Sequence, residues 1–64
     1  MKVIKVIPEH IYEVKAAVTC TVHFGADDQG MLICLVQPGE PCSFVAPGRE
    51  ICVSDDEAMV TMAI

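Results

Sequence analysis

The sequence predicts a small all-β domain, and a long polar–apolar alternation and two Pro-Gly turns nine residues apart carry that prediction. We expect a single domain over residues 1–64, arranged as an antiparallel meander or open barrel of five to six strands. A short C-terminal helix is the alternative for its last segment. A chain of 64 residues is too short for a multidomain enzyme, and 53% apolar residues is a large share for so small a domain to bury.

The first predicted strands lie in the first 24 residues. Residues 2–7 are predicted to form the N-terminal strand. In residues 12–24 every even position is apolar and most odd positions are polar, which predicts a half-buried strand. A helix that begins near Pro8 is the alternative for residues 12–17, whereas the β-branched residues after position 17 favour a strand. One strand of this length would span about 43 Å, so we expect a bend or bulge within it.

The central predicted elements follow a polar loop. Residues 25–30 begin and end with glycine, which suits a connection between two strands. Residues 31–36 are all apolar and predict a strand that is covered on both faces. Pro38-Gly39 and Pro47-Gly48 have the chemistry of type II turns, with positive φ at the glycine.

The elements after these turns are short. Residues 41–45 and 50–53 are predicted strands. Residues 54–57 have the S-x-x-E form of a helix capping box, which would begin a helix over the last residues. Residues 58–64 are few for a helix and include Val60 and Thr61, so a final strand is the favoured prediction.

Tight hairpins at all three connections would give the predicted sheet one uniformly apolar face. Two cross-strand rows make up this face: Val22, Ile33, Phe44 and Ile51, then Cys20, Leu35, Cys42 and Val53. The opposite face is too apolar for open water. We therefore expect it to be the interface of a homo-oligomer, with a monomer covered by its own termini as the alternative. The predicted interface residues are Leu32, Cys34, Val36 and Val45.

The charge is negative and unevenly distributed. The formal net charge is −5, and residues 16–64 contain seven acidic residues against Arg49 alone. Such a surface repels nucleic acid, because binding to nucleic acid depends on neutralising phosphates. Two acidic loops could instead face a basic protein partner, and we predict that they contact it. Their carboxylates belong to Asp27, Asp28, Asp55, Asp56 and Glu57.

The sequence also favours a reduced cytoplasmic protein. Lys2 and Lys5 interrupt the first apolar stretch, so we expect no secretory signal. The longest apolar run, residues 31–36, is far shorter than a membrane span, so we expect no membrane partner. Without a secretory signal, the predicted location is the cytoplasm, where thiols stay reduced.

The four cysteines are predicted to be free core residues. Their spacings contain no C-x-x-C pair, which argues against a structural zinc site. In the derived register Cys34 lies about 9.6 Å from Cys52, and Cys20 is equally far from Cys42, so neither pair can form a disulfide without a change of register. A disulfide and a metal site are the less favoured alternatives. Cys20 and His23 would point to opposite faces of a strand and cannot share a metal.

Catalysis is not indicated. Cys34, Cys52 and His23 are the one cluster that could support a thiol- or metal-dependent activity, and a sheet of this size offers little concavity to exclude water. No glycine pattern indicates a nucleotide. We predict no catalytic residues, no metal and no cofactor.

A non-catalytic interaction or regulatory module is therefore the predicted function. By analogy with other small acidic proteins, it would be an inhibitor or accessory protein, for example one encoded by a mobile element. The alternative is a structural, self-assembling subunit, and the thiol- or metal-dependent activity ranks third. The apolar outer face or an unpaired edge strand could accept another chain.

Overall fold

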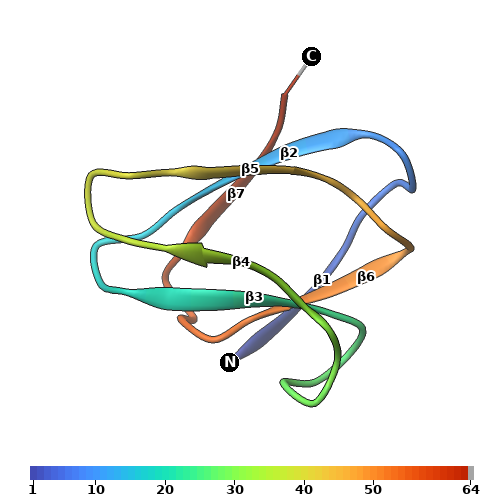
Figure 1. Cartoon of the computed structure of the whole chain (residues 1–64), viewed down its shortest axis with the longest axis horizontal. Helices are drawn as coiled ribbons and strands as arrows, with labels where there is room; N and C mark the ends of the chain where they lie inside the picture. The colour runs from blue at the N-terminus through green and yellow to red at the C-terminus, as the bar shows by residue number, and fades with distance from the viewer. Residues whose placement is uncertain (64) are drawn as a thin grey trace.

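The structure is a computed structural model that describes residues 1–63. It confirms the all-β class, with seven strands where five to six were expected (Figure 1). The last segment is a strand, so the alternative of a C-terminal helix is wrong. Nowhere in residues 1–63 is there a helix that is long and apolar enough to cross a membrane. The strands are β1 Lys2–Lys5, β2 Ile11–Lys15, β3 Cys20–Phe24, β4 Leu32–Val36, β5 Cys42–Val45, β6 Glu50–Val53 and β7 Met59–Ala63.

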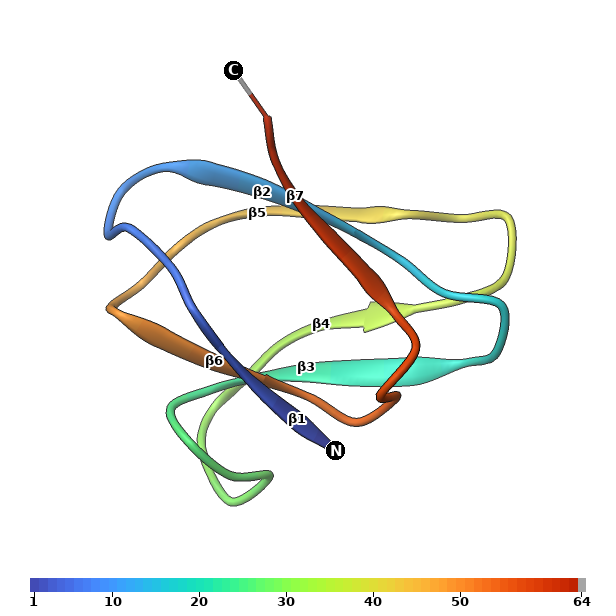
Figure 2. The same ribbon diagram turned by 180° about the vertical axis from the view of Figure 1, so that it is seen from behind.

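The strands form two antiparallel sheets that enclose the core (Figures 1 and 2). One sheet has the order β1-β6-β3-β4 and the other the order β5-β2-β7. The predicted meander is therefore wrong, because β5 pairs with β2 and β6 pairs with β1 and β3. At most of the connections, the chain leaves one sheet and enters the other.

The long alternation of residues 12–24 is divided between the two sheets. Strand β2 ends at Lys15, residues 16–19 make the bend, and β3 begins at Cys20. This confirms the expected interruption and excludes the helical alternative for residues 12–17. The alternation continues on both sides of the bend because both strands present one face to the same core.

At each of the two Pro-Gly turns the chain passes from one sheet to the other. Gln37 and Glu40 form the expected bridge, and Gly39 has the positive φ of 78° that a type II turn requires. Strands β4 and β5 nevertheless form no ladder beyond this bridge. A type II turn does not match the twist of a two-stranded hairpin, so the strands that flank it diverge.

The second turn departs further from the expected hairpin. The backbone N–H of Ala46 donates to the His10 carbonyl at 2.9 Å, and the Val6 N–H donates to the Arg49 carbonyl at 3.0 Å. Ala46 and Arg49 therefore bond to different sheets. Gly48 does not have a positive φ; a Cβ there would lie 2.5 Å from a ring carbon of Phe24. Close packing against that ring, and not turn geometry, is what requires this glycine.

The core lies between the sheets; four of the eight residues predicted to face inward are buried in it, and three more are partly buried against it. Tyr12 stacks on Phe44 with ring centroids 6.3 Å apart, and its hydroxyl accepts a hydrogen bond from the Ile7 N–H at 2.8 Å. A buried tyrosine is stable here because its hydroxyl has a partner. The buried cluster consists of Val6, Tyr12, Val14, Cys20, Val22, Val36, Ala46, Ile51, Val53 and Ala58.

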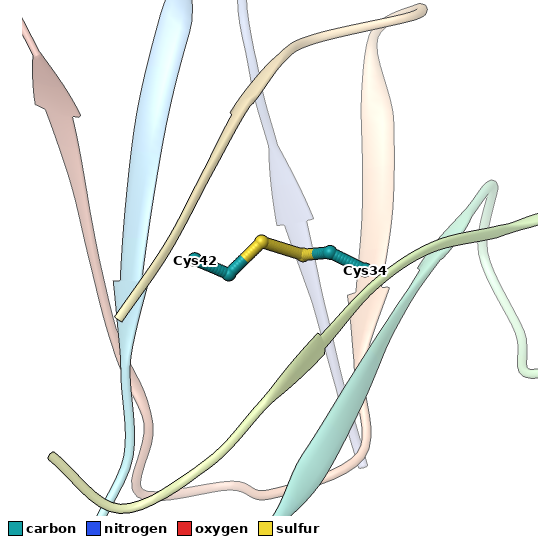
Figure 3. Close-up of a disulfide and its surroundings, with 2 residues drawn as sticks. All are labelled: Cys34 and Cys42. Carbon is teal, nitrogen blue, oxygen red and sulfur yellow. A yellow bond between two sulfur atoms is a disulfide. The ribbon is translucent and has the colours of Figure 1, made fainter. Parts of the chain in front are cut away.

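A β-bulge on β4 corrects the predicted register and with it the prediction for the cysteines. Val22 pairs with Cys34, whereas the next residue, His23, pairs with Leu32, so Ile33 is the extra residue. Because a shift of one residue reverses the face of every later side chain, Cys34 turns inward. There it forms a disulfide with Cys42, with the Cα atoms 6.6 Å apart (Figure 3). The prediction of four free cysteines is wrong for this pair and correct for Cys20 and Cys52, which are free and buried.

The sheets meet along two seams that differ in kind. At the closed seam, β4 and β5 are joined by the disulfide and by the Gln37–Glu40 bridge. At the open seam, β1 and β7 start near each other and then diverge without pairing (Figure 2). The Lys2 ammonium donates to the Ala58 carbonyl there, and the N-terminal amine pairs with Asp56.

Candidate functional site

The surface of the four-stranded sheet that points away from the core carries exposed apolar side chains. We call this surface the outer face. The register places Val3, Cys52, His23 and Leu32 in one row across its four strands. Val3 is 46% exposed and Leu32 54% exposed. The row is therefore apolar at its two edges and occupied by a thiol and an imidazole at its centre.

Leu35 extends this surface because of the bulge. It pairs with Thr21 and is 50% exposed, although the sequence register placed it in the core. The bulge that moves Cys34 inward also moves Leu35 outward. Nothing in the amino-acid pattern of residues 31–36 marks the extra residue, since all six are apolar.

His23 is held in a fixed orientation at the centre of the face. Its Nδ1 lies 3.0 Å from the Gly30 carbonyl and its Nε2 lies 3.1 Å from the Thr21 hydroxyl. A carbonyl can only accept, so Nδ1 carries the proton and donates it, and in the neutral ring Nε2 accepts from Thr21. Both ring nitrogens therefore have partners, and neither partner is Cys52.

Cys52 lies beside His23 but is not arranged as a nucleophile. Its side chain is only 1% exposed. Burial raises the pKa of this thiol most; the charge of Asp28 raises it, the N-terminal amine lowers it, and Asp27 raises it again. A protonated, enclosed thiol beside an imidazole that is engaged elsewhere is inert.

The predicted cluster of Cys34, Cys52 and His23 is therefore only partly assembled. Strand pairing brings His23 and Cys52 opposite each other, whereas Cys34 faces the core and is consumed in the disulfide. Among residues 1–63, no three His, Cys, Asp or Glu side chains are grouped so that they could hold a metal ion.

The first acidic loop lies at one end of the outer face. Asp27 and Asp28 lie in the loop that connects β3 to β4, and the charge of each raises the pKa of Cys52. The Gln29 backbone N–H donates to Asp27 at 3.0 Å, and its side-chain amide donates to Asp28 at 3.2 Å. The loop is thus held in shape by its own carboxylates, and both aspartates are exposed.

The second acidic loop lies at the opposite end of β6, as Figure 1 shows. Asp55 accepts a hydrogen bond from the Glu57 backbone N–H at 3.2 Å. Asp56 is paired with the N-terminal amine, which offsets its charge. The five predicted partner-binding carboxylates therefore form two groups at the two ends of the four-stranded sheet, and the group at Asp27 has the less compensated charge.

The four predicted interface residues do not form one surface. Val36 is fully buried in the core and Cys34 is half-buried in the disulfide. Leu32 belongs to the outer face, whereas Val45, 58% exposed, lies on the outside of the three-stranded sheet. Both were predicted to lie on one face, but the division into two sheets separates them.

A shallow hollow of about 510 Å³ lies at the end of β1 and was not expected from the sequence. Lys5 and Arg49 line it, and neither makes an ion pair with another described residue. Glu50 lines the same hollow and is the cross-strand neighbour of Lys5, so it offsets one of the two positive charges.

Comparison with known proteins gives no relative: no family model, no curated protein and no solved structure matches this chain.

Proposed function

We propose that the protein is a non-catalytic interaction module that binds another protein through the outer face of its four-stranded sheet. The observation that carries the proposal is the exposure of Val3, Leu32 and Leu35 on one face. A small domain with a filled core has no structural need for three half-exposed aliphatic side chains around one sheet face. Apolar surfaces of this kind, with polar groups at their margins, are typical of protein–protein contacts.

The charges around the face define the class of partner. Asp27 and Asp28 are exposed in the loop between β3 and β4, and Asp55 and Glu57 lie in the loop that follows β6. We propose a partner whose contact surface is apolar at its centre and basic at its margin. Attraction between exposed charges speeds association and depends strongly on salt, while the buried apolar contacts set the lifetime of the complex.

An inhibitor or accessory role suits such a module, including one encoded by a mobile element; this part of the proposal rests on analogy of size and charge. A catalytic role is disfavoured by the engaged nitrogens of His23 and the enclosed thiol of Cys52. No cofactor enters the proposal.

The redox state of the cysteines bears on the location. The sequence predicts the cytoplasm, whereas a Cys34–Cys42 disulfide persists in oxidising surroundings. Acid quenching of native cells, followed by alkylation and mass spectrometry, distinguishes the two. Four alkylated thiols would support the cytoplasmic prediction, and two would indicate an oxidising compartment.

A pair of matched variants tests the proposed binding face. Wild-type protein is cross-linked to its partner in the native host, and the affinity of the isolated partner is then measured for Leu32→Asp and Val45→Asp. Both side chains are more than half exposed, but they lie on different sheets. We expect Leu32→Asp to weaken binding by about tenfold or more and Val45→Asp to leave it nearly unchanged, since a few central contacts carry most binding energy.

Neutralising the acidic loop tests the electrostatic part of the proposal. Asp27→Asn together with Asp28→Asn is expected to slow association at low salt and to leave the dissociation rate almost unchanged. Equal affinity of Leu32→Asp and wild type for the partner would refute the binding face. An association rate that is independent of both salt and the double variant would refute the acidic rim.

A further inference from the structure

The free edge of β7 differs from the other three sheet edges. Strands β4 and β5 face each other at the closed seam, where the disulfide and the Gln37–Glu40 bridge join them. Strand β1 carries Lys2 and Lys5, and lysine on an edge strand discourages pairing with another chain. Strand β7, Met-Val-Thr-Met-Ala, has no charged residue and no proline, and among the described residues it pairs only with β2.

The strand is also accessible. Figure 2 shows β7 on the near side of the molecule, diverging from β1 as it rises. Met62 faces inward with its neighbour Tyr12 and is still 42% exposed, because no strand covers that side. Of the five residues of β7, Val60 alone is partly buried and the others are exposed.

The hydrogen bonds of β2 determine which groups of β7 are unpaired. Backbone groups of successive residues in an antiparallel ladder point alternately to the two neighbouring strands. The hydrogen bond from the Ala46 N–H to the His10 carbonyl shows that the backbone groups of the even-numbered residues of β2 point towards β5. Its odd-numbered residues therefore bond to β7, and their partners there are Met59, Thr61 and Ala63. The N–H and C=O groups of Val60 and Met62 consequently point out of the free edge.

We propose that the protein forms a symmetric dimer in which β7 pairs antiparallel with β7 of a second copy, with Thr61 on the two-fold axis. In this register Val60 lies opposite Met62 of the second copy, so the unpaired backbone groups of each strand meet those of the other. The two threonines face each other between these pairs, an arrangement that is favourable across strands. The two three-stranded sheets become one sheet of six strands.

Side-chain rows continue across the proposed junction. On the inner face, the row Phe44, Tyr12, Met62 meets Val60 of the second copy, so large side chains adjoin a small one. On the outside, the row Val45, Ile11, Ala63 meets Met59 of the second copy. These apolar side chains are exposed in the single chain and would cover one another in the dimer.

Charge favours this edge over the other surfaces for self-association. The chain has a net charge of −5, and contact through its acidic loops would bring like charges together. Strand β7 contributes no charge to the contact. The interface expected from the sequence is thereby relocated from Leu32 and Val36 to a strand edge, and the outer face stays free for the partner in the proposed function.

Charge exchange at position 61 tests the proposal by its symmetry. Thr61→Lys places two lysines opposite each other on the two-fold axis, and Thr61→Glu places two carboxylates there. We expect a dimeric mass for the wild type by light scattering at about 1 mM, where even a weak association is populated. Each variant alone is expected to be a monomer, and an equimolar mixture of the two variants should recover the dimer.

A matched variant separates this effect from loss of folding. Ser43 lies on the other side of Glu13 from Thr61, in the same outer row of the sheet. Ser43→Lys therefore adds the same charge away from the edge, and it should stay dimeric with the same circular dichroism as Thr61→Lys. A monomeric wild type at about 1 mM would overturn the proposal. So would a dimer that survives in Thr61→Lys and is dissociated by Leu32→Asp, or a mixture of the two variants that stays monomeric.

Discussion

The closed and open seams join the two sheets by different means. At the closed seam a turn and a disulfide tie β4 to β5, which are separated by only a few residues of chain. At the open seam β1 and β7 come from opposite ends of the described chain and are linked by polar contacts of Lys2 and the N-terminal amine. The covalent seam needs no further cover, whereas the open one leaves a complete strand edge unpaired.

The comparison shows how a chain of this size distributes its stability. A short domain buries a smaller fraction of its surface than a larger domain does, and disulfides commonly compensate for this. Here the single disulfide crosses between the sheets, so it holds together the two halves of the core. We therefore expect changes at the closed seam to cost more than changes at the open seam.

The largest expected effect is the loss of the disulfide. Cys34→Ser together with Cys42→Ser should lower the free energy of unfolding by about 2–3 kcal/mol, because the unfolded chain gains the freedom that the cross-link removes. Urea unfolding with and without a reductant measures this. Reductant should bring the wild type to the level of the double variant and leave the variant unchanged. A wild type that is insensitive to reductant would show that the seam holds without the bond.

The sequence could predict the alternation of inward and outward side chains but not the β-bulge that shifts the register. The inward positions of Val22, Ile51 and Val53 followed from period-two patterning and from loops whose chemistry is local. The bulge at Ile33 could not be predicted, because residues 31–36 are all apolar and any of them fits either face. That single residue decides whether Cys34 reaches Cys42 and whether Leu35 is exposed.

The candidate site was predictable to the same extent. The loop position of Asp27 was expected and is found, and Leu32 and Val45, predicted to share an outer face, both lie outside the core. Their division between two sheets was not expected, since the pairing of β5 with β2 is a long-range choice. The type II chemistry of the Pro-Gly turn is compatible with splayed strands, but it contains no information on which strand each would meet.

A second effect at the closed seam concerns its turn. Gly39 has φ of 78°, and an alanine there would adopt a left-handed conformation at a cost of about 1–2 kcal/mol. Apart from the two adjacent residues, no described residue has an atom within 4 Å of where a Cβ would be, so the cost is conformational and not steric. Gly39→Asn should cost clearly less than Gly39→Ala in thermal unfolding, because asparagine tolerates this conformation. Equal losses would contradict a conformational origin.

A third effect distinguishes the two free cysteines from the pair at the seam. Burial is the largest cause that raises the pKa of Cys20; the charge of Asp55 also raises it, and a backbone hydrogen bond at Asp55 lowers it. Burial likewise raises the pKa of Cys52. Above the ordinary thiol pKa the unfolded chain loses these protons while the folded chain keeps them, so stability falls as pH rises. The slope cannot exceed about 1.4 kcal/mol per pH unit for each thiol.

Replacing both free thiols isolates this contribution. The difference in stability between wild type and Cys20→Ala with Cys52→Ala is measured by urea unfolding from pH 7 to pH 10. We expect this difference to be constant up to about pH 8 and then to shift against the wild type. Tyrosine and lysine titrate in both proteins and cancel in the comparison. A difference that stays constant to pH 10 would show that the folded thiols ionise normally.

The smallest expected effect is at the open seam. Lys2→Met keeps the aliphatic stem but removes the ammonium that donates to the Ala58 carbonyl, at a cost of about 1 kcal/mol or less. Lys5→Met is the matched control, since Lys5 is exposed and its side chain bonds to no described residue. Thermal unfolding should rank the disulfide variant, then Gly39→Ala, then Lys2→Met, with Lys5→Met close to wild type. A loss for Lys2→Met as large as that for the disulfide would mean that the polar contacts at the chain ends, and not the covalent bond, hold the two sheets together.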